Sequence, residues 1–315
     1  MSKRFARLGI GLTSFVLLLG AVAAAQQPRI TNGKLAAQAA AGNLPQLFRS
    51  LVAAQTEAAW IGYSVPVAGE RMMCCFTNSN GTTYVSGSFV NSDGTCCGAC
   101  RIEPLADTSS ARTSAPATPA TPATVPVKLE GSQRMVVMFR IVDKQVERIR
   151  TFSEECELDA GGRQVHWLQD VRPAESIALL QSLIGTDADR KSRITNGAIS
   201  AIGMHADPSA ASTLVKLATD HPSPAVRGDA LFWVAQLASQ KAVGTITAAV
   251  ENDPDTDVKK RAVFALSQLP KSEGVPLLIN VARKNSNPAV RKQAMFWLGQ
   301  SKDPRAMEFF AEILK

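Results

Sequence analysis

The sequence predicts a protein of two parts: a strand-rich α+β module stapled by disulfides, followed by an all-α solenoid. Three observations lead to this prediction. The last half of the 315-residue chain repeats itself with a fixed period, all six cysteines precede residue 160, and a short apolar segment opens the chain. A fixed period indicates stacked helical hairpins, whereas an even number of cysteines in an exported chain indicates disulfides.

The opening segment, residues 1–25, has the layout of a secretory signal peptide. Lys3, Arg4 and Arg7 precede an apolar run, and small residues end the segment at Ala25. This order predicts cleavage after Ala25, a periplasmic or secreted protein, and no stable membrane span after cleavage. Without the three leader cations, 31 Lys and Arg remain against 27 Asp and Glu, a net charge of +4. Such a small excess argues against nucleic acid as a partner.

The repeat consists of three blocks spaced 32 residues apart. In the first block Val226, Ala230 and Val234 recur at helical spacing, which is the pattern of a helix with one buried stripe. A Ser, Asp or Asn before each block supplies a helix N-cap, and a second apolar pattern lies between the blocks. Each repeat therefore predicts a pair of helices, and together they predict a solenoid over residues 173–315. The blocks begin at Pro224, Thr256 and Pro288.

The third block resembles the HEAT-repeat family, in the short bacterial form of the phycobilin-lyase HEAT-like repeats. It reads Asn-Pro-Ala-Val-Arg-Lys-Gln-Ala-Met-Phe-Trp-Leu-Gly from Asn287 to Gly299. The resemblance covers residues 173–315 and implies an α-solenoid whose curved surface binds other proteins. It carries over no hydroxylase activity, because no histidine is followed by Glu, and it implies no cofactor. It also implies that one basic residue per repeat holds carboxylates and carbonyls between repeats, whereas the alternative is a site for an acidic ligand. These residues are Arg227, Lys259 and Arg291.

One position of each repeat places a phenylalanine opposite the buried stripe, and a glutamine follows one helical turn later. Two interpretations stay open. The rings and amides form a ladder on the concave face that binds a peptide or partner helix, or the rings pack between repeats. Trp233 and Trp297 lie within the stripe and are expected in the core. The ladder residues are Phe232, Phe264, Phe296, Gln236, Gln268 and Gln300.

Residues 26–172 show no family pattern but have the texture of an α+β module. A helix is predicted over residues 44–59. Asp143 and Lys144 are predicted to form a hairpin turn between two strands. A Pro-, Ala- and Thr-rich stretch at about 108–126 predicts a disordered insertion, because it cannot bury a core. Strands are predicted at 71–76, 82–90, 134–142, 145–152 and 164–168.

The six cysteines of this module favour structural disulfides, as in other small exported domains. Adjacent cysteines rarely bond to each other, so the two vicinal pairs are expected to join one another and Cys100 to join Cys156. Two alternatives stay open: a redox pair at Cys97 and Cys100, and a soft-metal site of thiolates beside Met72 and Met73. The disulfide candidates are Cys74, Cys75, Cys96, Cys97, Cys100 and Cys156.

The sequence contains none of the common catalytic motifs, neither G-x-S-x-G, H-E-x-x-H, a P-loop nor G-x-G-x-x-G. The expected function is therefore that of an exported, non-enzymatic interaction or scaffold protein with a protein or peptide partner in the cell envelope. The C-terminal helix, which contains Phe309, is a candidate for self-association. The alternatives are a thiol-redox or soft-metal protein, and an enzyme whose site lies between the two parts, with His166 and the acidic turn at 154–159.

Overall fold

The computed structural model describes eight stretches of the chain. The predicted signal peptide, the predicted insertion at 108–126, and Cys96 and Cys97 lie outside them. Among the described helices, none combines the length and the apolar character needed to cross a membrane. The described residues are 28–40, 42–69, 74–77, 83–86, 100–103, 133–187, 192–237 and 240–314.

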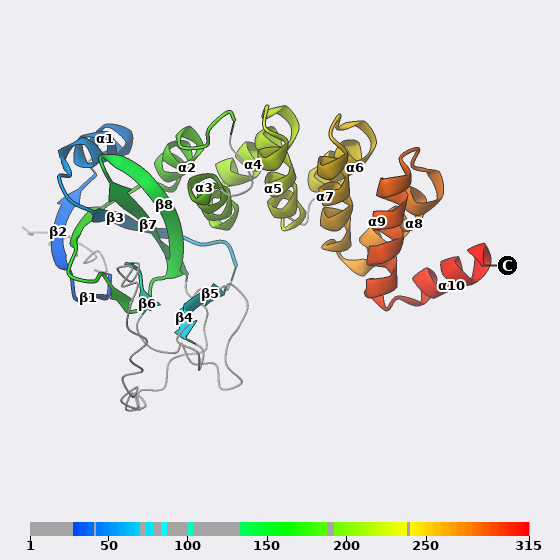
Figure 1. Cartoon of the computed structure of the whole chain (residues 1–315), viewed down its shortest axis with the longest axis horizontal. Coiled ribbons are helices and arrows are strands. Elements are labelled where there is room, and N and C mark those ends of the chain that lie inside the picture. Colours follow the sequence, from blue (N-terminus) through cyan, green and yellow to red (C-terminus); the bar gives the residue numbers. More distant parts are fainter. Residues whose placement is uncertain are drawn as a thin grey trace, which may run out of the picture.

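A five-stranded sheet forms the centre of the N-terminal part, in the order β2-β10-β3-β7-β8 (Figure 1). Strand β10 runs parallel to both β2 and β3, whereas β7 runs antiparallel to its two neighbours, β3 and β8. Asp143 and Lys144 connect β7 to β8 with φ angles of 50° and 58°, the left-handed pair that a type I′ hairpin turn requires. The predicted hairpin is therefore confirmed. The strands are β2 (Lys34–Ala39), β3 (Ala59–Pro66), β7 (Arg134–Val142), β8 (Gln145–Ser153) and β10 (Gln164–Gln169).

The prediction was wrong about the segment between β2 and β3. Helix α1 (Leu44–Ala54) ends five residues before the predicted end, and the following residues form the central strand β3. All of β3 except its last residue is buried, because neighbouring strands flank it and both faces of the sheet are covered. Its apolar residues therefore do not alternate with polar ones, and the pattern that identifies a half-exposed strand is missing.

Two smaller sheets accompany the main one. The first has the order β1-β9-β6, and its strands pair in parallel. The second is the antiparallel pair β4 and β5, which confirms two predicted strands over shorter lengths. Their bounds are β1 (Ile30–Thr31), β4 (Cys74–Thr77), β5 (Thr83–Ser86), β6 (Cys100–Arg101) and β9 (Leu158–Asp159).

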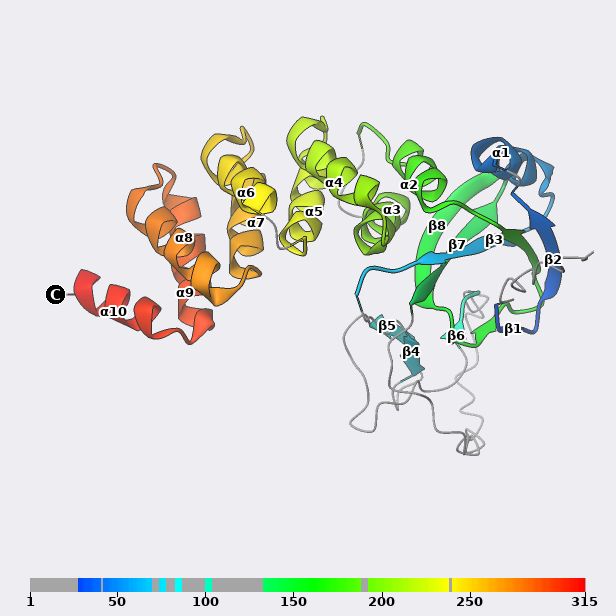
Figure 2. The same ribbon diagram turned by 180° about the vertical axis from the view of Figure 1, so that it is seen from behind.

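The C-terminal half is a row of antiparallel helices that continues from the sheet (Figures 1 and 2), as the repeat predicted. The predicted N-caps are formed: the side chains of Asp255 and Asn287, for example, accept hydrogen bonds from the first-turn N–H groups of α7 and α9. The helices are α2 (Pro173–Ser182), α3 (Arg193–Met204), α4 (Pro208–Asp220), α5 (Pro224–Ala235), α6 (Gln240–Asn252), α7 (Thr256–Ser267), α8 (Lys271–Lys284), α9 (Pro288–Ser301) and α10 (Pro304–Ile313).

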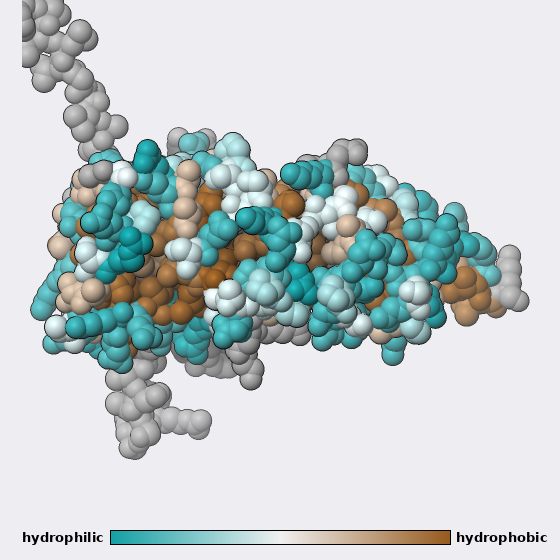
Figure 3. Space-filling view, turned by 90° about the horizontal axis from the view of Figure 1, so that it is seen from above, coloured by the Kyte–Doolittle hydropathy of each residue, from teal (hydrophilic) through white to brown (hydrophobic). Residues whose placement is uncertain are grey.

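The helices form two layers of unequal spacing. Helices α3, α5, α7 and α9 contact one another along the row, whereas α4, α6, α8 and α10 contact one another much less. The row therefore curves, with α5, α7 and α9 on its concave side. At its far end Ile313 and Leu314 are exposed. The view from above shows an apolar patch at that end of the molecule (Figure 3, right).

One hydrophobic core runs without interruption from the sheet into the solenoid. It contains Phe48 of α1, Phe139 of β7 and Ile149 of β8 together with the buried residues of the helices. Helix α3 approaches the edge strand β8 so closely that a Cβ atom on Gly197 would lie 2.5 Å from the backbone oxygen of Ile149. The sheet and the first solenoid helices are thus packed together as one body.

The structure does not support the predicted disulfide staple. Among the residues whose side chains are described, no disulfide is present, and Cys156 is a buried thiol in the smaller core on the other face of the sheet. Trp60, Phe152 and Leu158 surround that position in the same core. The described part of the module is thus held by apolar packing, in which a cysteine behaves as a small apolar side chain.

Candidate functional site

The concave layer carries a continuous strip of aromatic side chains that crosses three repeats. Phe232 of α5 and Phe264 of α7 stack with their rings 6.0 Å apart and 5° from parallel. Phe264 contacts Trp297 of α9 at 4.9 Å, and Phe296 meets Trp297 edge-on at 5.0 Å. Trp233 contacts Phe232 edge-on at 5.4 Å. We call these five residues the aromatic strip.

The strip is only partly buried. Phe232 and Phe264 are half-buried, and Phe296 is 53% exposed. The rings thus pack between repeats, as one of the two interpretations predicted, and they also leave a surface open to solvent. Binding of a partner to that surface stays a prediction. Trp233 and Trp297, which were expected in the core, pack against it but are only partly buried.

Small residues make room for the strip. A Cβ atom on Gly203 of α3 would lie 2.3 Å from the ring of Trp233, so the ring occupies the space that a side chain would fill. A Cβ atom on Gly228 of α5 would likewise lie 2.4 Å from the side chain of Arg261. The sequence pattern did not reveal these contacts, because they join different repeats.

A groove of about 290 Å³ lies at one end of the strip, between α3, α5 and α7. Phe232, Trp233 and Phe264 form its aromatic side. Its polar side holds an ion pair in which Arg261 lies 2.6 Å from Asp229. We call this the aromatic groove. It combines a large apolar surface with a polar edge, as sites for peptide side chains do.

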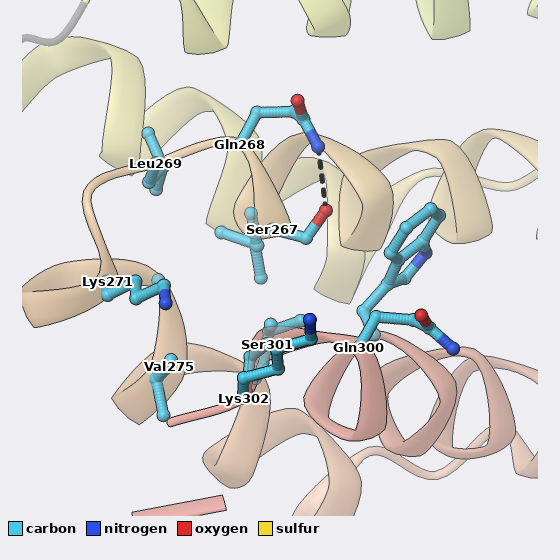
Figure 4. Close-up of a pocket in the computed structure, with 12 residues that line it drawn as sticks. Ser267, Gln268, Leu269, Lys271, Val275, Gln300, Ser301 and Lys302 are labelled. Atoms are coloured by element: carbon cyan, nitrogen blue, oxygen red, sulfur yellow. Dashed lines mark hydrogen bonds between the residues drawn. The ribbon is translucent and has the colours of Figure 1, made fainter. Parts of the chain in front are cut away.

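A second cavity, of about 360 Å³, lies between α7, α8 and α9 (Figure 4). Its rim carries Gln268, Lys271, Gln300 and Lys302, all exposed. Trp297 also lines it, so the contact of Trp297 with Phe264 joins it to the aromatic groove. We call it the lysine-rimmed cavity. Its floor consists of the buried side chains of Leu266, Leu269, Val275 and Leu278.

The predicted ladder of glutamines is thus divided by the structure. Gln268 and Gln300 lie at the lysine-rimmed cavity, where Gln268 donates a hydrogen bond of 3.1 Å to the hydroxyl of Ser267 (Figure 4). Gln236 is exposed but lines neither the groove nor this cavity. Whether these side chains contact a partner stays a prediction.

The basic position shared by the repeats is structural, as the family resemblance implied. Arg227 donates to both carboxylate oxygens of Asp253, at 2.8 and 3.0 Å, and to the carbonyls of His221 and Pro222. Arg291 donates to two carbonyls at the equivalent positions, and Lys259 donates to the carbonyl of Glu251. These side chains thus tie the chain segments between successive repeats to the helices that follow them.

A buried polar network, which the sequence did not suggest, lies where the sheet meets the solenoid. The Ser176 hydroxyl of α2 lies 2.7 Å from the hydroxyl of Tyr63 and 2.8 Å from Nε2 of His205. Burial lowers the pKa of His205 and raises that of Tyr63. All three side chains are sealed from solvent. A serine and a histidine in contact suggest a nucleophile, but no substrate can reach this one, so the network serves to join the two parts.

The residues expected at an enzyme site are not brought together. His166 on β10 lies 3.1 Å from the side chain of Gln55, whereas Glu154 accepts a hydrogen bond from Ser64 and pairs with Arg134. A second acidic residue, Glu103, is held by Arg140, Trp60 and Arg163. Burial of Glu103 opposes its ionisation, but the hydrogen bonds from Arg140 and Trp60 outweigh burial and lower its pKa.

The thiol and metal alternatives gain no support from the described residues. Burial raises the pKa of the Cys156 thiol to about 12, the opposite of the shift that activates a redox cysteine. No group of three or more His, Cys, Asp or Glu side chains within the described stretches is placed to hold a metal ion. Cys74, Cys75 and Cys100 lie in the short strands β4 and β6.

Comparison with known families identifies the repeat. The family model described as HEAT repeats matches residues 212–278 and 243–315. No curated protein matches the sequence.

Several solved structures are similar over part of the chain. The complex of CpcE and CpcF of phycocyanin lyase from Nostoc sp. PCC7120 has 15% identity and a TM-score of 0.36, with 45% of this chain and 89% of that chain covered. Human deoxyhypusine hydroxylase in complex with glycerol has 17% identity and a TM-score of 0.32, with 40% and 43% covered. The Escherichia coli protein YibA has 22% identity and a TM-score of 0.32, with 45% and 54% covered. This chain thus spans about half the length of the last two, and at these scores none of the three assigns it an activity.

Proposed function

We propose that this chain is an exported, non-enzymatic scaffold whose concave solenoid face binds a segment of a protein in the cell envelope. The match of residues 212–315 to the HEAT-repeat family model supports this role. The observation that carries the proposal is the aromatic strip. It crosses three repeats, joins the aromatic groove to the lysine-rimmed cavity, and leaves ring surface open to solvent.

The energetics favour a partner at this strip. A phenylalanine buries on the order of 150–250 Å² when it is covered completely. Phe296 is 53% exposed, so a partner would remove roughly 100 Å² of its surface from water. At about 25 cal/mol per Å² this single side chain would contribute about 2–3 kcal/mol to binding. The rim amides of Gln268 and Gln300 would add hydrogen bonds to a peptide backbone.

Export and the absence of catalysis are part of the same proposal. The layout of residues 1–25 supports export, and the mature chain would begin at Gln26. The sealed network around Ser176 and the separation of His166 from Glu154 support a role other than catalysis. Cell fractionation, followed by mass spectrometry of the envelope form, tests export: a chain that retains residues 1–25 in the cytoplasm would contradict it.

The binding proposal is tested by cross-linking in cells. A photoreactive residue placed at position 296 of the full chain is expected to cross-link one defined envelope protein. The matched control places it at Met307, which is 65% exposed but lies on α10 outside the strip. The variant Phe264→Ser should abolish the cross-link from position 296 while the protein remains folded by circular dichroism. Equal cross-linking from positions 296 and 307, or no effect of Phe264→Ser, would refute the strip as the binding surface.

A further inference from the structure

We propose that the lysine-rimmed cavity binds the C-terminal residue of the partner segment, with an apolar side chain on its floor and the terminal carboxylate at its rim. This inference rests on the proposed function, because it assigns one end of the same binding surface. It names a class of ligand: a peptide with a free C-terminus and an apolar last residue.

The floor of the cavity selects for an apolar side chain. Four aliphatic residues form it, and each is almost completely buried in the core between α7 and α8. At about 360 Å³, the cavity falls at the small end of ligand pockets, which span about 300–1,000 Å³. A charged side chain on this floor would lose its hydration without gaining a partner, which is unfavourable.

The rim of the cavity selects for a negative charge. Lys271 and Lys302 both line it, and no acidic residue lines it. The nearby acid, Asp303, already accepts two hydrogen bonds of 2.9 Å from Arg305. These bonds, with a smaller contribution from Lys271, lower the pKa of Asp303 to about 2. Asp303 is therefore engaged mainly by Arg305, and its attraction for Lys271 is the smallest of these contributions.

Floor and rim together favour a chain terminus over an internal acidic residue. A glutamate carries its charge at the tip of its side chain, so insertion of that side chain would bring the charge to the apolar floor. The C-terminal residue instead carries its charge on the backbone and its apolar group on the side chain. It can therefore keep the carboxylate beside Lys271 and Lys302 while its side chain fills the floor.

The rest of the peptide would follow the aromatic strip. Phe264 lines the aromatic groove, Trp297 lines the lysine-rimmed cavity, and their rings are 4.9 Å apart. Adjacent packed helices are separated by about 8–10 Å, which an extended chain covers in about three residues. A second apolar side chain, three residues before the terminus, would therefore reach the groove beside Phe232.

The test uses an array of random heptapeptides in two matched forms, with a free C-terminal carboxylate or with a C-terminal amide, probed with the full-length mature protein. We expect selection of free-acid peptides that end in Leu, Ile, Val or Phe. Their affinity should exceed that of the matching amides by at least about tenfold, because the amide lacks the charge that strengthens hydrogen bonds to an ammonium group.

Charge variants assign the selectivity to the cavity. The double variant Lys271→Gln/Lys302→Gln should bind acid and amide forms equally, whereas Lys284→Gln, an exposed lysine at the other end of α8, should keep the preference. Equal binding of acids and amides by the wild-type protein, preference for an internal Asp or Glu, or a preference that survives the double variant would overturn the inference. Binding that still requires Phe264 would in those cases uphold the proposed function. Failure of both peptide forms to bind would count against both proposals.

Discussion

The ion pair of Arg227 with Asp253 offers a sharp test of how the repeats are held together. The two side chains are 9% and 6% exposed, and they are joined by two hydrogen bonds of 2.8 and 3.0 Å. Replacement of Arg227 by Met would leave the Asp253 carboxylate with one described donor, the backbone N–H of Asp255 at 2.9 Å. It would also remove the donor from the carbonyls of His221 and Pro222.

The expected cost follows from that geometry. Removal of one partner of a buried ion pair leaves an uncompensated charge and costs about 3–5 kcal/mol. Arg291 occupies the same repeat position but is more exposed, and it donates only to the carbonyls of Asn285 and Ser286. Because water can replace those bonds at an exposed site, Arg291→Met should cost only about 1–2 kcal/mol. The two substitutions are chemically identical, so their difference isolates the carboxylate.

The free energies of unfolding are measured by urea titration, followed by circular dichroism and tryptophan fluorescence. In a double-mutant cycle, Arg227→Met with Asp253→Leu should recover about 2–3 kcal/mol relative to the sum of the single variants, because the paired charge is gone. A loss at Arg227→Met within about 1 kcal/mol of that at Arg291→Met would refute the role assigned to the ion pair.

Three further predictions concern the junction and the strip. Burial lowers the pKa of His205, so on acidification the unfolded chain binds a proton more readily than the folded chain does. The contribution of neutral His205 to the free energy of unfolding is therefore complete above the ordinary histidine pKa of about 6.5 and falls as the pH drops below it. The difference between the melting temperatures at pH 7.5 and pH 5.0 should be smaller in His205→Gln than in the wild-type protein. An equal difference in the two proteins would contradict this account. Gly197→Ala should destabilise the protein by about 1–3 kcal/mol, because the new Cβ would meet the backbone of β8. Gly299→Ala, where the new Cβ would lie in open space, should stabilise it by about 0.5–1 kcal/mol. Equal effects of the two substitutions in a thermal melt would argue against tight packing of α3 on the sheet. Trp297→Phe should leave the free energy of unfolding unchanged or raise it by about 1 kcal/mol, because the buried indole N–H has no hydrogen-bond partner among the described residues. A clear loss of stability in urea titration would contradict this expectation.

The repeating half was predictable because its signals are local. Helical spacing of the apolar residues, N-caps such as Asp255 and Asn287, and the fixed period are all properties of adjacent residues, and each was confirmed. The basic position was predictable for a different reason, since the resemblance to HEAT repeats implied its contacts before the geometry of Arg227 was known.

The N-terminal half was predicted less well because its order comes from distant segments. Strand β3 pairs with β10, about a hundred residues later in the chain, and is buried on both faces, so its residues do not alternate. The disulfide staple was expected from cysteine number, whereas Cys156 packs in an apolar core with Trp60 and Phe152. Burial of this kind depends on which strands meet, and local spacing carries little information about it.

By itself, then, the sequence determined the solenoid, its period, and the one face on which Phe232, Phe264 and Phe296 recur, because helical periodicity places side chains on a face without any knowledge of their neighbours. Only the tertiary structure decided what that face became. The rings meet across repeats, Gly203 makes room for Trp233, and the ends of α7, α8 and α9 enclose a cavity with lysines at its rim. These features arise where separate helices approach one another, and that approach is set by the packing of the whole core.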